Sequence, residues 1–259
     1  MPALRRRDPG GITVMPTAPK IDISPCGDAA LRVTVVGDDT DEVWAAVHRL
    51  AGWLNRGEIH PTVSAVPTYD AVLVEFDPYH TTGDAIMSYI QSWDAAPGVG
   101  SAVPSGVIDV PVLFGGDAGP DLEWVAGVVG APVAEVIGLV CAKEHLIRCL
   151  GGPAASAMTD GPEFGVPVPR LATPRLRVPP GAVSVAGRQA VIGPVAAPSG
   201  WRQIGRTPLT ILRTDGTGES GGGDAVVPYR PGDRVRFFPV DEATYAGLLG
   251  VPMRYRDHD

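Results

Sequence analysis

Residues 182–192 read Ala-Val-Ser-Val-Ala-Gly-Arg-Gln-Ala-Val-Ile, and this stretch decides the fold expected for the second half of the chain. It contains two short β-type runs, 182–186 and 190–192, on either side of a glycine. Comparable runs follow at 209–213 and 234–240, and Gly/Pro pairs interrupt the region about every 8–12 residues. Strands this short and this regularly interrupted predict a closed β-barrel or a β-sandwich.

The N-terminal part has a different pattern, in which strand pairs alternate with helices. Residues 21–23 and 31–36 predict one strand pair, and 62–66 and 71–76 predict a second. A helix is expected after each pair, because apolar residues recur there at helical spacing: first Val43, Val47, Leu50 and Leu54, then Ile86, Tyr89, Ile90 and Trp93. The pattern predicts a small α+β sandwich with both helices on one face of an antiparallel sheet.

These patterns divide the chain into five segments. We expect a flexible tail at 1–19, an α+β domain at 20–94, a Gly- and Pro-rich linker at 95–106, a β-barrel domain at 107–245 and a C-terminal tail at 246–259. Within the barrel domain, 106–114 predicts a strand and 120–141 predicts two helices divided near Gly130. The acidic, low-complexity stretch 214–225 predicts a mobile hairpin tip.

Composition excludes several classes of protein. The chain has 259 residues and a formal net charge of -8, which argues against nucleic acid or an anionic membrane as a partner, because both need a basic face. The longest apolar run, 124–140, contains Pro132 and Glu135 and is too short to span a bilayer. Three cysteines without C-x-x-C spacing indicate neither a disulfide framework nor a thiolate zinc site, and no export signal follows Arg5 to Arg7. A cytoplasmic protein is expected.

Familiar catalytic motifs are missing from the sequence. There is no G-x-x-x-x-G-K-[ST] phosphate loop, no H-E-x-x-H zinc motif and no G-x-S-x-G nucleophile elbow, and the five histidines are scattered. One G-x-G-x-x-G occurs at 216–221, but it leads into another predicted strand, whereas a dinucleotide site needs a helix there. We therefore predict no metal site and assign no catalytic residue from the sequence.

An anion-binding site is the one chemical feature that the residues suggest. In 170–207 arginines alternate with turn glycines, and the candidate ligand-binding residues are Arg175, Gly187, Gln189, Ser199, Trp201 and Arg206. Arginine can hold a carboxylate or phosphate through two parallel hydrogen bonds, and glycine lets a ligand approach the backbone. The alternative is that Trp201 packs against a barrel end and the arginines are ordinary solvated charges.

The same region resembles the C-terminal domain of the KipI / allophanate hydrolase subunit 1 family, whose members are now mostly described as the B subunit of the ATP-dependent bacterial 5-oxoprolinase. The resemblance extends over about residues 22 to 245. Its motifs, in chain order, are 27–31, 67–69, 109–116, 119–122, 173–194, 198–207 and 231–237.

The resemblance implies a ferredoxin-like N-terminal domain followed by a cyclophilin-like β-barrel. It also implies association with a second cyclophilin-like subunit, and with a third protein for ATP-dependent conversion of 5-oxoproline to glutamate. The older family name implies hydrolysis of allophanate. ATP is the cofactor implied, bound by this chain or by its partner.

The sequence departs from the family pattern at one place. Val140, Cys141 and His145 stand where the family usually has histidine, serine and tyrosine, and 152–156 replaces a loop that carries aromatic residues. Because valine cannot transfer a proton, this chain has changed its substrate or lost the reaction if the family histidine is catalytic. The leading expectation is a subunit of a 5-oxoprolinase- or allophanate-type amidohydrolase that is inactive alone. The alternative is a regulator that binds a histidine kinase, as one family member does.

Overall fold

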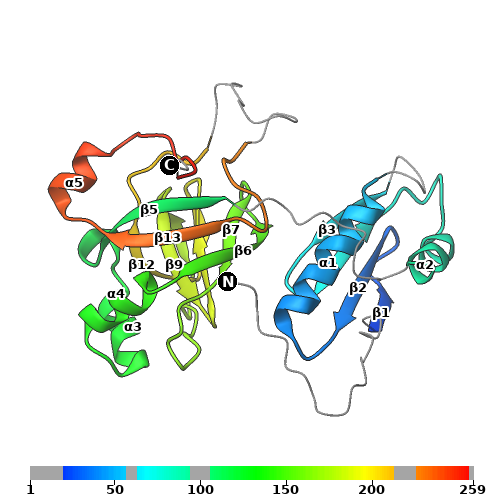
Figure 1. The fold of residues 1–259 in the computed structure, drawn as a ribbon, viewed down its shortest axis with the longest axis horizontal. Helices are drawn as coiled ribbons and strands as arrows, with labels where there is room; N and C mark the ends of the chain where they lie inside the picture. Colours follow the sequence, from blue (N-terminus) through cyan, green and yellow to red (C-terminus); the bar gives the residue numbers. More distant parts are fainter. Residues whose placement is uncertain (1–19, 57–62, 94–105, 213–225, 257–259) are drawn as a thin grey trace, which may run out of the picture. The chain divides into compact units, whose positions relative to one another are not determined.

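The computed structural model of the chain describes residues 20–56, 63–93, 106–212 and 226–256. The linker expected at 95–106, apart from its last residue, and the hairpin tip expected at 214–225 therefore lie outside the described residues. The chain forms two compact units that divide between residues 101 and 102. Each unit is described by itself below (Figure 1).

The first unit is a four-stranded antiparallel sheet with two helices. Its elements, in chain order, are β1 (Lys20–Pro25), β2 (Ala30–Val36), α1 (Thr40–Leu54), β3 (Ser64–Pro67), β4 (Ala71–Glu75) and α2 (Gly83–Gln91). The strand order is β1-β2-β4-β3, and every pair is antiparallel. Two side chains cap the helices: Asp39 accepts hydrogen bonds from the backbone of Asp41 and Glu42 before α1, and Thr82 accepts one from the backbone of Ala85 before α2.

Both predicted apolar stripes pack on this sheet. Val43, Val47, Leu50 and Leu54 of α1 and Ile86 and Ile90 of α2 are buried with alternate residues of the strands. The expected α+β unit is therefore present. A ferredoxin-like topology is not confirmed, because that fold runs β-α-β-β-α-β and this unit runs β-β-α-β-β-α.

The second unit is a closed barrel of seven short strands, as the Gly/Pro spacing predicted. The strands follow one another around the barrel in the order β10-β7-β6-β13-β5-β12-β9, and β9 pairs with β10 to close it. Their bounds are β5 (Val107–Phe114), β6 (Glu144–Gly151), β7 (Ser156–Asp160), β9 (Ala182–Ala186), β10 (Gln189–Ile192), β12 (Arg202–Arg206) and β13 (Arg234–Pro239). Strand β13 lies parallel to β5 on one side and antiparallel to β6 on the other.

Two elements outside the barrel wall are needed for the site. Strands β8 (Arg175–Val178) and β11 (Ala197–Ser199) form a separate two-stranded antiparallel sheet. It is called here the β8–β11 hairpin, although β9 and β10 lie between its two strands in the sequence. The strand predicted at 209–213 is not formed: within its described residues only an isolated bridge joins Thr210 to Pro252. A short 3-10 turn η1 (Gly116–Ala118) follows β5.

Helices α3 (Leu122–Val129) and α4 (Val133–Cys141) connect β5 to β6. Gly130 ends α3 in the left-handed region at φ 76°, as expected for a C-cap glycine. Leu122 and Val125 of α3 and Val136 and Val140 of α4 are buried in the barrel core. Among the described residues no single helix has the length and composition of a membrane span; the two criteria are met only by α3 and α4 taken together, which meet at 90°.

The C-terminal segment, expected to be a tail from 246 onward, packs on the barrel up to the last described residue. After α5 (Glu242–Gly247), Met253 is buried in the barrel core. The Tyr255 hydroxyl donates a hydrogen bond to Asp233, a fully buried carboxylate. Arg256 forms two hydrogen bonds with Asp109 on β5. The second unit thus includes part of the expected tail.

Candidate functional site: a pocket on the outer face of the barrel

A pocket of about 230 Å³ lies on the outside of the barrel wall and is called here the outer pocket. Its place follows from the alternation of side chains along strands. Val183 and Val185 of β9 point into the core, whereas their neighbours Ala182 and Ser184 line the pocket. Strand β7 does the same with Ala157 inside and Met158 outside. The floor of the pocket is therefore the outer face of β7, β9 and β10.

The β8–β11 hairpin and the chain beside it cover this floor. Val178 of β8 and Ser199 of β11 line the pocket, and Trp201, which follows the hairpin, is 9% exposed. The Arg170 guanidinium lies over the Trp201 ring, 5.5 Å from its centroid. Of the described residues that line the pocket, Arg170 alone carries a charge. The site thus combines apolar walls with one cation held beside an aromatic ring.

Hydroxyl groups supply further polarity. Ser184 is 3% exposed, and its side chain is on the outer face of β9, where it can exchange a hydrogen bond with a ligand. The Ser199 hydroxyl accepts a hydrogen bond from the Trp201 backbone N–H at 3.1 Å. Ser156 donates to the Pro153 carbonyl at 2.9 Å. All of these residues line the pocket.

One end of the pocket is formed by the 152–156 turn, where the resemblance led us to expect a loop with aromatic residues. Gly152, Pro153 and Ser156 contribute to its lining. Ala154 and Ala155 in the same turn have φ values of 53° and 58°, a region that residues with a side chain rarely adopt. The Tyr229 hydroxyl donates to the Ala155 carbonyl at 3.1 Å. The 152–156 turn therefore forms part of the wall of this pocket.

Behind the hairpin, Asp121 forms a nearly buried ion-pair network. Arg175 donates from both terminal nitrogens to its two carboxylate oxygens, at 2.6 and 2.9 Å. The backbone N–H of Gln203 donates to Oδ2 at 2.8 Å, and a nitrogen of Arg202 lies 3.6 Å from Oδ1. Burial alone would raise the pKa of Asp121, but these hydrogen bonds and the charges of Arg175 and Arg202 outweigh it and lower the pKa.

The local sequence allows this close approach. Asp121 is the residue before α3, and Gly119 comes two positions earlier. A Cβ atom at Gly119 would collide with the backbone carbonyl of Ile204 on β12. Only glycine lets the turn approach β12 closely enough for Asp121 to meet the Gln203 N–H.

The six residues predicted to bind an anion do not form one site. Ser199 and Trp201 line the outer pocket. Arg175 has both terminal nitrogens engaged by Asp121, and Arg206 donates from Nε to the Pro180 carbonyl at 2.9 Å without lining the pocket. Gly187 lies in the β9–β10 turn at φ 58°, and Gln189 begins β10 opposite Asp160. Ligand binding by any of the six residues stays a prediction.

Three residues of the site were not selected from the sequence: Arg170, Ser184 and Asp121. Arg170 lies at the start of the arginine-rich stretch, outside the motif that begins at Thr173. Asp121 lies within a family-like motif, but its partner Arg175 is 54 positions away. The sequence alone does not indicate that an acidic residue before a helix pairs with a distant arginine, because the fold of the barrel brings the two together.

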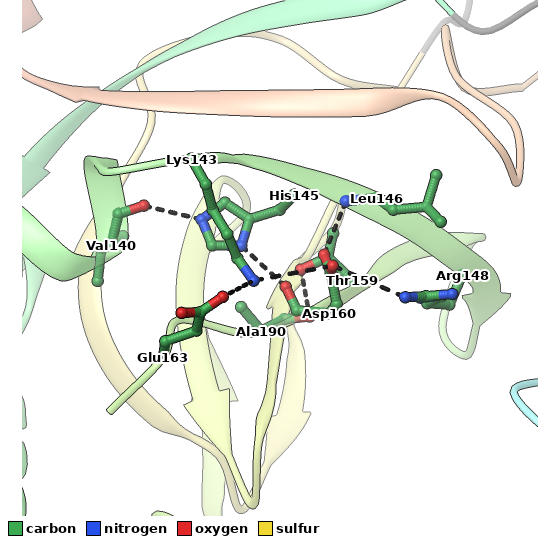
Figure 2. Close-up of polar contacts among 9 residues, drawn as sticks. All are labelled: Val140, Lys143, His145, Leu146, Arg148, Thr159, Asp160, Glu163 and Ala190. Atoms are coloured by element: carbon green, nitrogen blue, oxygen red, sulfur yellow. Dashed lines mark hydrogen bonds and ion pairs between the residues drawn. The ribbon is translucent and has the colours of Figure 1, made fainter. Parts of the chain in front are cut away.

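His145, which stands at a position where the family has tyrosine, is fully buried between α4 and β7 (Figure 2). Its Nε2 lies 2.8 Å from the Val140 carbonyl and its Nδ1 lies 2.8 Å from the Asp160 carbonyl. Carbonyl oxygens only accept, so both contacts are hydrogen bonds only when both ring nitrogens carry a proton. The ring joins two elements and does not line the outer pocket.

The charged residues around His145 form a network of their own. The Asp160 carboxylate accepts a hydrogen bond from the Leu146 N–H at 2.7 Å and has Lys143 and Arg148 at 3.9 and 3.8 Å, while Lys143 also pairs with Glu163 at 3.2 Å. Figure 2 shows these contacts together on the same end of β6 and β7. Each charge thus faces an opposite charge, which is typical of a structural network.

The three cysteines differ in exposure: Cys26 is exposed, whereas Cys141 and Cys149 are partly or fully buried. Burial raises the pKa of the Cys141 and Cys149 thiols to about 11, so both stay protonated and unreactive near neutral pH. No group of His, Cys, Asp or Glu side chains among the described residues could hold a metal ion. Among its described lining residues, the outer pocket has one charged side chain, Arg170, and the hydroxyls of three serines, Ser156, Ser184 and Ser199.

Comparisons with known proteins identify the family. Residues 21–219 match the model of the carboxyltransferase domain, subdomain C and D. The chain is 32% identical over 202 residues to the B subunit of 5-oxoprolinase from Escherichia coli O157:H7, a match covering 77% of this chain and 85% of that protein. It is 25% identical over 236 residues to the B subunit of 5-oxoprolinase from Bacillus subtilis, covering 87% of this chain and 95% of that protein.

Solved structures agree on the fold. The crystal structure of TTHA0988 superposes with a TM-score of 0.66 at 27% identity, over 82% of this chain but only 40% of that one. The urea amidolyase of K. lactis superposes with a TM-score of 0.76 at 17% identity over 92% of this chain and 16% of that one, which is a likeness of fold alone. The family match and the E. coli relative together show that the chain belongs to the family of 5-oxoprolinase B subunits.

Proposed function

We propose that this chain is one subunit of a 5-oxoprolinase- or allophanate-type amidohydrolase complex, and that the outer pocket holds the small anionic substrate. The observation that carries the proposal is Arg170, a single cation held over Trp201 at a pocket whose other polar side chains are serines. A carboxylate could pair with the guanidinium while the apolar part of the ligand lies against the ring. Both 5-oxoproline and allophanate carry one carboxylate.

The size of the pocket supports a small ligand. Its volume of about 230 Å³ is below the ~300–1,000 Å³ of sites that hold drug-sized molecules. A nucleoside triphosphate is larger and carries several negative charges, which one arginine cannot balance. We therefore assign the ATP of the reaction to another surface of the assembled complex.

Catalysis requires partners under this proposal. A second cyclophilin-like subunit and a third protein would supply the nucleophile, the proton-transfer groups and the ATP site that the described residues lack. We place the complex in the cytoplasm, in keeping with three cysteines that are all free. The 152–156 turn at one end of the pocket supports a ligand preference different from that of relatives with an aromatic loop there.

The test is ligand binding by the complex reconstituted with the subunits encoded beside this chain. Calorimetric titration with 5-oxoproline and with allophanate should show binding of one of them, and Arg170→Ala should weaken it by ~10-fold or more, because a charge-assisted hydrogen bond contributes ~1.5–3 kcal/mol. The affinity of Arg170→Lys should lie between those of wild type and Arg170→Ala, since lysine keeps the charge but not the planar fork.

Arg188→Ala is the matched control, because Arg188 is an exposed arginine of the same stretch that does not line the pocket. Equal affinity of wild type and Arg170→Ala would remove the ligand from the outer pocket. Binding of a histidine kinase by the chain, with no binding of either small molecule, would instead support the regulator.

A further inference from the structure

We propose that Asp121 is a positioning residue of the outer pocket, which holds the β8–β11 hairpin and the start of β12 in the places where their side chains can meet a ligand. The inference rests on the proposed function, because it takes the outer pocket as the ligand site. Asp121 itself does not line the pocket and would act only through Arg175 and Gln203.

The β8–β11 hairpin is not hydrogen-bonded into the sheet of the barrel wall. Its two strands form a sheet separate from the barrel, so no ladder of backbone hydrogen bonds fixes them to the wall. Yet Val178 and Ser199 of the hairpin contribute to the pocket lining. The shape of the pocket therefore depends on contacts that hold the hairpin down.

The Arg175–Asp121 ion pair is one such contact. Its two parallel hydrogen bonds fix both distance and orientation, and the Asp121 side chain is 7% exposed whereas that of Arg175 is 32% exposed, so water screens the carboxylate less than the guanidinium. Among the described residues no other carboxylate forms an ion pair with the hairpin. Arg175 is also the register partner of Ser199, so the position of one sets that of the other.

The same carboxylate also bonds to β12, which begins just after Trp201. Its Oδ2 accepts from the Gln203 N–H, two residues after Trp201. The Gln203 side chain in turn donates to the Ala118 carbonyl at 2.7 Å. One buried carboxylate thus joins the hairpin, which carries Ser199, to the strand that follows Trp201.

Asp121→Asn and Arg175→Met test the inference with little change of side-chain volume. In the reconstituted complex, each should raise the Kd or KM for 5-oxoproline by ~10-fold and change kcat less, because the substrate site is displaced and the reacting groups lie elsewhere. The double variant should show about the same ~10-fold effect as Asp121→Asn alone, because under this inference Arg175 affects the pocket only through Asp121. Arg175→Lys, which keeps the charge, should recover part of the loss.

Amide hydrogen exchange gives a readout that does not depend on the ligand. Asp121→Asn should speed exchange across residues 175–178 and 197–201 while β6 and β13 keep the protection of wild type. Asp109→Asn, which breaks a similar carboxylate–arginine pair elsewhere on the barrel, is the control and should leave the hairpin unchanged.

Unchanged exchange of the hairpin in Asp121→Asn would overturn the inference, as would a double variant with the ~100-fold effect of two independent losses. If the wild-type complex binds no 5-oxoproline, the proposed substrate is wrong, and the exchange measurement still decides whether Asp121 positions the hairpin. If Asp121→Asn fails to fold, the same measurements can be made on Arg175→Lys and Arg175→Met, which change the more exposed residue of the pair.

Discussion

Two carboxylates of the barrel unit, Asp121 and Asp109, both pair with arginines but differ in how far they are exposed to solvent. Each binds two arginines: Asp121 binds Arg175 and Arg202, and Asp109 binds Arg236 and Arg256. The side chain of Asp121 is 7% exposed, whereas that of Asp109 is 31% exposed. Asp109 accepts four hydrogen bonds from its arginines and Asp121 only two, but water and salt screen an exposed pair, so the number of hydrogen bonds does not set the contribution to stability.

Asp121→Asn should have the largest effect on the stability of the barrel unit. The change leaves Arg175 and Arg202 facing a neutral amide in a nearly dry site, so we expect a loss of about 3 kcal/mol in the free energy of unfolding. Urea denaturation followed by far-UV circular dichroism would measure it. A loss below ~1 kcal/mol would mean that the site is wetter than its 7% exposure indicates, and the contrast with Asp109 would disappear.

The next largest effect should appear in how the stability of the barrel unit depends on pH in the acid range. The hydrogen bonds from arginine lower the pKa of both below the ordinary value of 3.8. Each therefore stabilises the native state above that value, and the contribution is lost as the pH falls from 3.8 through the native pKa. We expect the stability of wild type to fall more steeply below pH ~4 than that of Asp121→Asn, which has lost one of these groups.

Unfolding in urea at a series of pH values from neutral to acid would test this, with Asp109→Asn as the comparison. Identical acid profiles for wild type and Asp121→Asn would show that the carboxyl titrates alike in the folded and unfolded chain.

The smallest effect is expected for Asp109→Asn at neutral pH. Its partners Arg236 and Arg256 are 48% and 38% exposed, so we expect a loss under ~1 kcal/mol. Raising the salt concentration from 0.1 to 1 M, where the screening length falls from ~10 to ~3 Å, should reduce that loss further and leave the loss in Asp121→Asn nearly unchanged. Equal salt sensitivity of the two variants would contradict the assignment of one pair as buried and the other as screened.

Local signals predicted the first unit well because its elements are specified by neighbours in sequence. The apolar spacing of Val43, Val47, Leu50 and Leu54 places all four on the buried face of α1. The caps Asp39 and Thr82 lie just before their helices, where a side-chain oxygen can reach free backbone N–H groups. The order of the four strands in the sheet depends on packing between distant segments, and there the ferredoxin-like expectation is not confirmed.

The barrel shows where sequence reasoning reaches its limit. Gly/Pro spacing predicted a closed barrel, yet the run at 209–213 is apolar enough for a strand and its described residues form only a bridge. In the site, Arg175 was a reasonable candidate for an anion because guanidinium groups bind carboxylates; the carboxylate it binds is Asp121 of the same chain. Charge type can be read from sequence, but whether a charge is already neutralised depends on contacts across 54 positions.

Strand β13 determines when the barrel can form during synthesis of the chain. It lies between β5 and β6 and is parallel to β5, with Arg236 opposite Asp109, residues 127 positions apart. Until Pro239 has left the ribosome, β5 and β6 have no strand between them, and the backbone groups on the edges that face β13 stay unpaired. We expect the first unit to fold while translation continues and the barrel to close only after nearly the whole chain has emerged, which exposes its nascent strand edges to chaperones.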